Sequence, residues 1–154
     1  MSERKLNYVK ISPEPYKLMS ALGHYLTAES GLEQTLLEFV KLRASLLNGC
    51  HFCIELHTGE LKKIHETADR IAGLSGWRNT DIYTQRERAA LAFAEAVTNI
   101  QEGMPDAVFA AVREHFTEKE MVDLTWAIAQ INAWNRMGIT FQPEPRTLEA
   151  AQVS

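Results

Sequence analysis

Residues 48–57 of the chain read Asn48-Gly49-Cys50-His51-Phe52-Cys53-Ile54-Glu55-Leu56-His57. Asn48-Gly49 is a helix-breaking pair, so the stretch predicts that one helix ends there and the next begins near Cys50. On that second helix Cys50, Cys53 and His57 share one face, because they are spaced three and four residues apart. Two thiols able to form a disulfide would then lie beside an imidazole able to carry a proton. This arrangement is typical of redox chemistry.

Helical periodicity continues on both sides of this segment. Ser12-Pro13 predicts a helix start, because Ser is a good N-cap and Pro fits the first helical position. Thr84-x-x-Glu87 and Thr117-x-x-Glu120 are capping boxes, which mark two further starts. Continuous strand alternation is absent from the sequence. We therefore predict an all-α bundle of about six helices, over 12–28, 32–47, 50–74, 84–100, 106–115 and 117–140.

The length and composition fit one domain over residues 1–154. The chain is 45% hydrophobic and 23% charged, which is ordinary for a globular protein able to bury a core. We expect the core to span about 12–141. Residues 142–154 contain Pro143 and Pro145 and are expected to form a loose C-terminal tail.

Charge and hydropathy indicate the compartment and the partners. The formal net charge is −4, and Lys and Arg form no cluster, so we expect no nucleic-acid partner. No apolar run reaches the ~18 residues of a membrane span. The first residues, Met1–Lys5, lead into no apolar signal segment. We therefore expect no membrane partner and a cytoplasmic location, where a C-x-x-C is typical of a catalytic or metal-binding site.

The predicted last helix differs from the others. Residues 121–139 carry apolar side chains around nearly its whole circumference. A helix that is apolar all round must be buried. It is either the central helix of the bundle or part of a contact between subunits, and the sequence leaves both readings open.

Glu38 is a third candidate member of the Cys/His site. It lies ten residues before Asn48, while His57 lies eight residues after Gly49. An antiparallel helical hairpin about this turn would bring the two side chains face to face. A carboxylate in that position fixes the tautomer of the histidine and raises its basicity. The hypothesis is therefore a Glu–His–Cys proton relay.

The residues alone leave two questions open. Cys50 is nearer to the helix N-terminus and Cys53 is nearer to His57, so local physics does not choose the nucleophile. The same cysteines with His57 are also three zinc-type ligands, and His51 is a conceivable fourth. However, no second C-x-x-C or H-x-x-x-H completes a closed tetrahedral site. A zinc-binding structural protein is therefore a weaker alternative, as is a purely structural oligomer.

Glu38, Cys50-x-x-Cys53 and His57 together resemble the signature of AhpD-type alkylhydroperoxidases, which belong to the carboxymuconolactone decarboxylase superfamily. The segments 36–43, 48–54 and 131–136 are similar to that family as well, and the similarity is closest over about 30–75. The resemblance implies an AhpD-like all-α bundle with the C-x-x-C at the N-terminus of a helix. It also implies a homo-oligomer, trimeric or hexameric, that reduces organic hydroperoxides.

By this resemblance, Cys53 is the thiolate that attacks the peroxide and Cys50 is the partner that closes the disulfide. His57 and Glu38 would be the relay that deprotonates Cys53. A dithiol reductant, either lipoyl-bearing or thioredoxin-like, would restore the thiols. We expect no cofactor and no metal.

The chain departs from the family pattern at one position. The best-studied members have a second histidine immediately before the second cysteine, where this chain has Phe52. Its extra histidine is His51, which points about 100° away around a helix. This departure keeps open a general disulfide oxidoreductase with little peroxidase activity.

Overall fold

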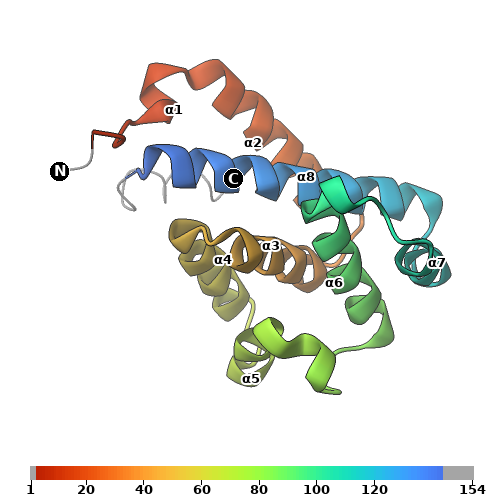
Figure 1. Ribbon diagram of the computed structural model, residues 1–154. Helices are drawn as coiled ribbons and strands as arrows, with labels where there is room; N and C mark the ends of the chain where they lie inside the picture. Colours follow the sequence, from red (N-terminus) through yellow and green to blue (C-terminus); the bar gives the residue numbers. More distant parts are fainter. Residues whose placement is uncertain (1–2, 144–154) are drawn as a thin grey trace.

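The structure is a computed structural model that describes residues 3–143 (Figure 1). The described part of the chain contains helices and no strands, which confirms the all-helical prediction. It forms eight α-helices rather than about six, because two short helices add to the long ones. They are α1 (Tyr8–Ile11), α2 (Pro13–Ala28), α3 (Gln34–Asn48), α4 (His51–Lys63), α5 (Ala68–Ala72), α6 (Gln85–Thr98), α7 (Asp106–His115) and α8 (Glu118–Phe141), with 3₁₀ turns η1 (Gly73–Asn79) and η2 (Ile100–Glu102).

The capping signals predicted two helix starts correctly. Thr84 and Glu87 form a reciprocal capping box at the start of α6, and Thr117 and Glu120 do the same for α8. α2 begins at Pro13, as the sequence indicated. Of the predicted tail, only residues 142 and 143 are described; 144–154 lie outside the described residues.

The prediction of one continuous helix over 50–74 is wrong. α4 ends at Lys63, and His65 adopts a left-handed conformation with φ 62°. Thr67 then caps a new helix, α5, through its side chain, which accepts a hydrogen bond from the backbone N–H of Arg70. The chain turns there without any Gly or Pro. The turn brings the following segment back over α3, where Leu74 and Trp77 are buried.

The long helices are arranged around α8 and α3. In Figure 1, α8 runs between α2 on one side and the α3–α4 pair on the other. α6 packs against α3, α7 and α8. The core has two parts. One lies between α2, α3, α6 and α8; the other lies beneath η1 and consists of Phe39, Leu42, Leu61, Leu74, Trp77, Tyr83 and Leu91.

α8 is central to the bundle, but one of its faces is uncovered. Leu124, Ile128 and Ile131 are buried against the neighbouring helices. Val122 and Trp126, one turn apart, remain 56% and 55% exposed. Complete burial of this helix within one chain, one of the two expectations, is therefore not observed.

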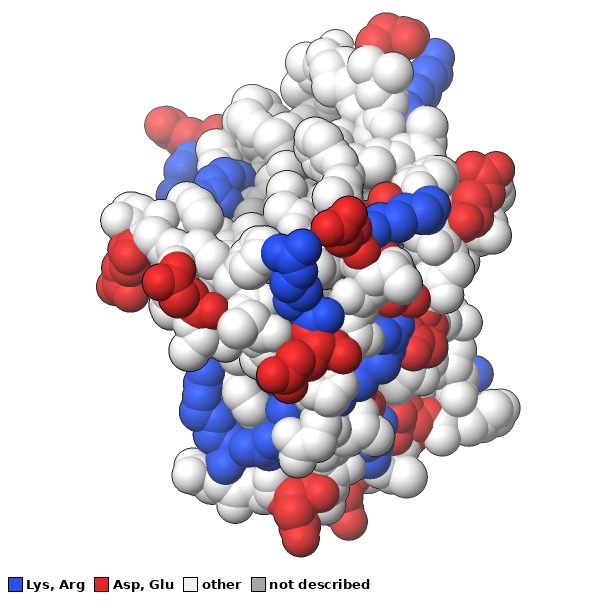
Figure 2. Space-filling view, turned by 90° about the vertical axis from the view of Figure 1, so that its right-hand side faces the viewer, with Lys and Arg blue, Asp and Glu red and all other residues white. Residues whose placement is uncertain are grey.

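Acidic and basic side chains are mixed over the molecular surface. Figure 2 shows them interspersed on one face of the molecule. Several are paired, such as Arg70 with Glu87 at 2.5 Å and Arg86 with Glu33 at 2.9 Å. Among residues 3–143, no helix has the length and apolar character needed to cross a membrane.

Candidate active site

The turn between α3 and α4 places the two cysteines. Gly49 ends α3 in a left-handed conformation with φ 71°, which glycine adopts without strain. Cys50 follows as the N-cap of α4, and its Sγ accepts a hydrogen bond from the backbone N–H of Cys53 at 3.4 Å. The backbone N–H of Cys50 donates to the carbonyl oxygen of Ser45 at 3.1 Å. The turn therefore fixes Cys50 to both helices.

Cys50 and Cys53 form a disulfide, with their Cα atoms 5.3 Å apart. Both residues are almost fully buried, at 2% and 3% exposed. The two cysteines are therefore in the oxidised state, and the N-terminus of α4 supplies a backbone N–H donor to the sulfur of Cys50.

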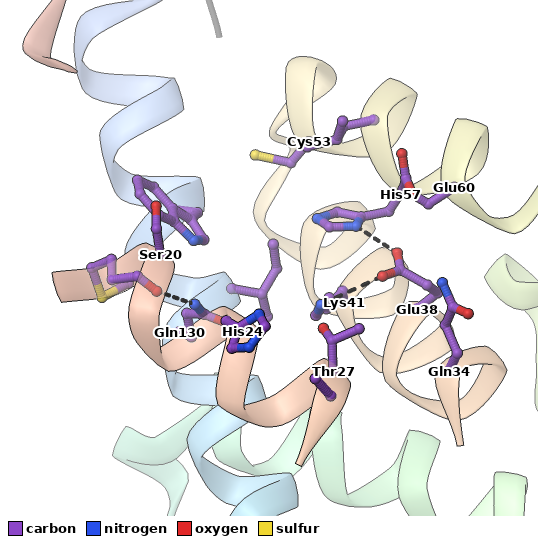
Figure 3. A pocket seen from close by; sticks show the side chains of 16 residues that line it. Ser20, His24, Thr27, Gln34, Glu38, Lys41, Cys53, His57, Glu60 and Gln130 are labelled. Carbon is purple, nitrogen blue, oxygen red and sulfur yellow. Dashed lines mark hydrogen bonds and ion pairs between the residues drawn. The ribbon is translucent and has the colours of Figure 1, made fainter. Parts of the chain in front are cut away.

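Glu38 and His57 meet across the α3–α4 hairpin, as the spacing predicted. Nδ1 of His57 lies 2.7 Å from Oε2 of Glu38 (Figure 3), and both side chains are buried. Because an ionised carboxylate only accepts hydrogen bonds, His57 donates from Nδ1. Figure 3 shows its other ring nitrogen on the side away from Glu38, facing the pocket. That nitrogen is free to exchange a proton with a bound group.

Lys41 adds a positive charge that the sequence analysis did not consider. Its Nζ lies 3.4 Å from Oε1 of Glu38, one turn earlier on α3. Burial alone raises the pKa of the Glu38 carboxyl, but the charge of Lys41 and the hydrogen bond from His57 outweigh it and hold the pKa at about 2. Glu38 is therefore an anion at neutral pH. The i, i+3 spacing of the two residues on one helix could have indicated Lys41.

A pocket of about 280 Å³ lies over this group. Cys53, His57, Glu38 and Lys41 line it from α3 and α4. The opposite wall comes from α2 and α8 and includes Ser20, His24, Thr27 and Gln130 (Figure 3). Met19, Ile131 and Trp134 of the same two helices also line the pocket. Three of the four predicted site residues therefore line this one pocket. The fourth, Cys50, does not line it.

Cys50 lines a second pocket of about 360 Å³, between the start of α4 and the C-terminal end of α8. His51 is exposed and lines this second pocket, not the first. The extra histidine of this chain is thus separated from Glu38 and His57. Within residues 3–143, no group of three or more His, Cys, Asp or Glu side chains is arranged to hold a metal ion.

Sequence comparison agrees with the geometry. Residues 13–96, which run from α2 into α6 and include the whole Glu38–Cys50–Cys53–His57 group, match the Carboxymuconolactone decarboxylase family. The chain belongs to this family. The family predicted from the sequence is thereby confirmed.

Several proteins are similar to this carboxymuconolactone decarboxylase family member over most of its length. The uncharacterized protein YdfG of Bacillus subtilis (strain 168) is 42% identical, covering 90% of this chain and 94% of YdfG. A crystal structure from Agrobacterium tumefaciens, of a protein of unknown function that is a candidate antioxidant defence protein AhpD, has a TM-score of 0.86. It is 42% identical and covers 90% of this chain and 94% of its own. An uncharacterized peroxidase-related protein from Ralstonia eutropha JMP134, with an AhpD core, shares the fold at a TM-score of 0.77. It is 23% identical, over 94% of this chain and 78% of its own.

A network of amides on α8 holds the C-x-x-C turn of this family member in place. Nδ2 of Asn48 donates to Oδ1 of both Asn132 and Asn135, at 2.9 Å each. Asn135 in turn donates to the Ser45 hydroxyl at 3.0 Å. The sequence of residues 131–136 resembles that of the family, but the resemblance did not predict a function for these residues. Its contacts anchor the end of α3, directly before Cys50, to α8.

Gly138 is a further residue that sequence reasoning missed. A Cβ atom at this position of α8 would lie 2.9 Å from Sγ of Cys50 and 3.6 Å from Sγ of Cys53. The absence of a side chain lets α8 pass directly over the disulfide. An isolated Gly in an apolar helix is a signal of such close packing.

Proposed function

We propose that this protein is a thiol-dependent peroxidase that reduces organic hydroperoxides through a Cys50/Cys53 dithiol–disulfide cycle. The observation that carries the proposal is the buried Glu38–His57 pair in the same pocket as Cys53, next to a disulfide. A histidine held by a carboxylate can take the proton of a thiol four residues away on its own helix. Met19, Ile131 and Trp134 give the pocket apolar surface for an alkyl group.

The proposed oxidation needs Cys53, Cys50, His57 and Glu38. His57 takes the proton of the Cys53 thiol, and the Cys53 thiolate attacks the terminal oxygen of the hydroperoxide. The O–O bond breaks, His57 returns the proton to the departing alkoxide, and the alcohol leaves. The Cys50 thiol then attacks the Cys53 sulfenic acid, which releases water and forms the disulfide. Glu38 remains an anion throughout and stabilises the His57 imidazolium.

The cycle requires a dithiol reductant, and we propose a lipoyl-bearing or thioredoxin-like donor for this role. Such a donor is oxidised to its own disulfide while Cys50 and Cys53 return to thiols. We also propose that the working form is a homo-oligomer, a trimer or a hexamer. The uncovered face of α8 supports this assembly.

Replacement of Cys53 by Ser tests the mechanism. We expect Cys53→Ser to abolish hydroperoxide consumption, because the attacking sulfur is gone. Cys50→Ser should still react once and stop as a sulfenic acid, since no partner thiol remains. The measurement is stopped-flow mixing of the reduced proteins with tert-butyl hydroperoxide, followed by mass spectrometry of the 48–57 peptide. Full turnover by Cys53→Ser would exclude the proposed cycle.

The position of His51 favours one alternative, a general disulfide oxidoreductase with little peroxidase activity. His51 lines the pocket of Cys50, so the Cys53 pocket contains only one histidine of the C-x-x-C segment. The two functions differ in their oxidant. A peroxidase is oxidised faster by tert-butyl hydroperoxide than by oxidised glutathione at equal concentration, whereas the alternative shows the reverse order.

A further inference from the structure

The disulfide separates two pockets that share no lining residue. The first pocket contains Cys53 together with His57 and Glu38. The second contains Cys50 together with His51, Phe52 and Glu55 from α4 and Gly138 and Ile139 from α8. Cys50 and Cys53 therefore line different pockets.

The separation of the two pockets determines which sulfur an incoming thiol can attack during thiol–disulfide exchange. The incoming thiolate attacks one sulfur in line with the S–S bond and expels the other sulfur. An in-line attack on Cys50 must therefore come from the side away from Cys53, and the pocket that Cys50 lines is the second one. An in-line attack on Cys53 must come from the other side.

Gly138 leaves the wall of the second pocket without a side chain beside Cys50. It lines the second pocket, and a Cβ atom there would lie 2.9 Å from Sγ of Cys50. Any side chain at this position would occupy space directly against the sulfur. Ile139 beside it is 40% exposed, and with Phe52 it gives the pocket an apolar wall. Such a wall fits the aliphatic chain of a small dithiol.

We propose that the reductant enters through this second pocket and attacks Sγ of Cys50, while the hydroperoxide reaches Cys53 through the first pocket. The inference rests on the dithiol–disulfide cycle proposed above and adds to it the place where the reducing half of the cycle occurs. The occupant is a dithiol carried on an aliphatic chain.

The reduction then proceeds in two balanced steps. One reductant thiol loses its proton to His51, its thiolate bonds to Cys50, and Cys53 leaves as a thiolate. Neutral His57, after taking up a proton from solvent, protonates that thiolate, while His51 releases its proton to solvent. The second reductant thiol loses its proton to His51 and attacks its partner sulfur in the mixed disulfide, and Cys50 leaves as a thiolate that later takes that proton back. The backbone N–H of Cys53, which already donates to the Cys50 sulfur, stabilises that thiolate until it is protonated. The reductant loses two electrons and the protein gains them.

Attack on Cys53 would lack these advantages. Its leaving group would be Cys50, which lies outside the pocket of His57. The reductant would also have to enter beside the buried charges of Glu38 and Lys41. When the reductant attacks Cys50, the first sulfur to leave is that of Cys53, which shares its pocket with the proton donor His57. The reductant then does not occupy the first pocket, where the hydroperoxide binds.

The attacked sulfur can be identified in the unaltered protein. Protein oxidised with diamide is mixed with glutathione as a monothiol probe, quenched at low pH with N-ethylmaleimide, and digested. At the earliest quench times we expect glutathione on Cys50 and N-ethylmaleimide on Cys53. The opposite placement would overturn the proposal. Because diamide supplies the disulfide, the result does not depend on any reaction with peroxide.

Variants of the pocket walls give a second, independent test. Ile139→Trp fills the second pocket, and we expect it to slow reduction of the oxidised protein by dihydrolipoamide about tenfold or more. Thr140→Trp, at the neighbouring position of α8, lines neither pocket and should leave reduction unchanged. His24→Trp, in the wall of the first pocket, should slow oxidation by tert-butyl hydroperoxide but not reduction. Slower reduction in His24→Trp with normal reduction in Ile139→Trp would contradict the assignment.

Discussion

Glu38 holds a negative charge in a buried position, only 7% exposed. Its carboxylate is stabilised there by Lys41 at 3.4 Å and by His57 at 2.7 Å. Against the cost of burial, these partners lower its pKa from 4.5 to about 2. A carboxyl whose pKa is lowered on folding contributes stability above its unfolded pKa and loses that contribution as the pH falls through its folded pKa.

The acid stability of the protein should therefore depend on Glu38. Between pH 4.5 and pH 2, the free energy of unfolding of the wild type should fall more steeply than that of Glu38→Gln. The loss should be on the order of 2 kcal/mol, because one unit of pKa corresponds to about 1.4 kcal/mol. Urea unfolding at a series of pH values measures it. Near pH 7 the variant should be less stable than the wild type, since Lys41 and His57 lose their charged partner.

Glu14→Gln is the matched control for this measurement. Glu14 also pairs with a lysine three residues away, Lys17 at 2.9 Å, but both side chains are exposed. An exposed pair of this kind contributes little to stability. Its replacement should leave the pH dependence unchanged. If Glu38→Gln and the wild type show parallel curves, the partners of Glu38 do not stabilise its charge.

At the scale of secondary structure elements, the contact between α8 and α4 depends on Gly138. We expect Gly138→Ala to destabilise the oxidised protein by about 1–3 kcal/mol, because the added methyl group overlaps Sγ of Cys50 and forces the helices apart. In the reduced protein the Cys50 side chain is free to rotate, so the penalty should be smaller. Urea unfolding with and without a phosphine reductant compares the two states.

Gly59→Ala provides the control for helix propensity. Gly59 lies within α4, and a Cβ atom there would meet nothing within 4 Å. Alanine at this position should therefore stabilise the protein by about 0.5–1 kcal/mol. Equal and favourable effects of the two substitutions would show that α8 does not need a glycine over the disulfide.

The same elements show which features the sequence could predict. Capping boxes and the Ser12-Pro13 pair predicted helix starts, because these signals act within one turn of chain. The Glu38–His57 contact was predictable because a tight turn fixes the register of the two helices that it joins. The site residues could therefore be predicted from the helical spacing of Cys53 and His57 and from the single turn that joins α3 to α4.

Features that depend on distant contacts were not predicted. The break after Lys63 has no Gly or Pro to mark it, and the chain turns at a left-handed His65 so that η1 can pack on α3. Gly138 and the division of the cysteines between two pockets depend on how α8 crosses α4, which no local pattern specifies. The helical spacing of Lys41 and Glu38 allows an ion pair between them. A lysine three residues after a glutamate is common on solvated helices, however, so the spacing alone did not place Lys41 in the site.

At the scale of the whole molecule, the exposed face of α8 indicates assembly. Val122 and Trp126 lie one turn apart on α8 and are both more than half exposed, whereas Leu124, Ile128 and Ile131 of the same helix are buried. An exposed apolar patch of this kind is typical of a protein–protein contact, and a large aromatic side chain at its centre contributes strongly to binding. A second copy of the chain is the partner that our proposal of a homo-oligomer requires.

Trp126→Glu tests this assembly. We expect wild-type protein to sediment as a trimer or hexamer and Trp126→Glu to sediment as a smaller species, because a buried unpaired charge costs several kcal/mol at each contact. Circular dichroism should remain helical, since the indole is exposed in the single chain. Phe109→Glu on α7, another exposed aromatic position, is the control and should keep the wild-type assembly. A monomeric wild type, or dissociation by both substitutions alike, would mean that this face of α8 is not the specific contact.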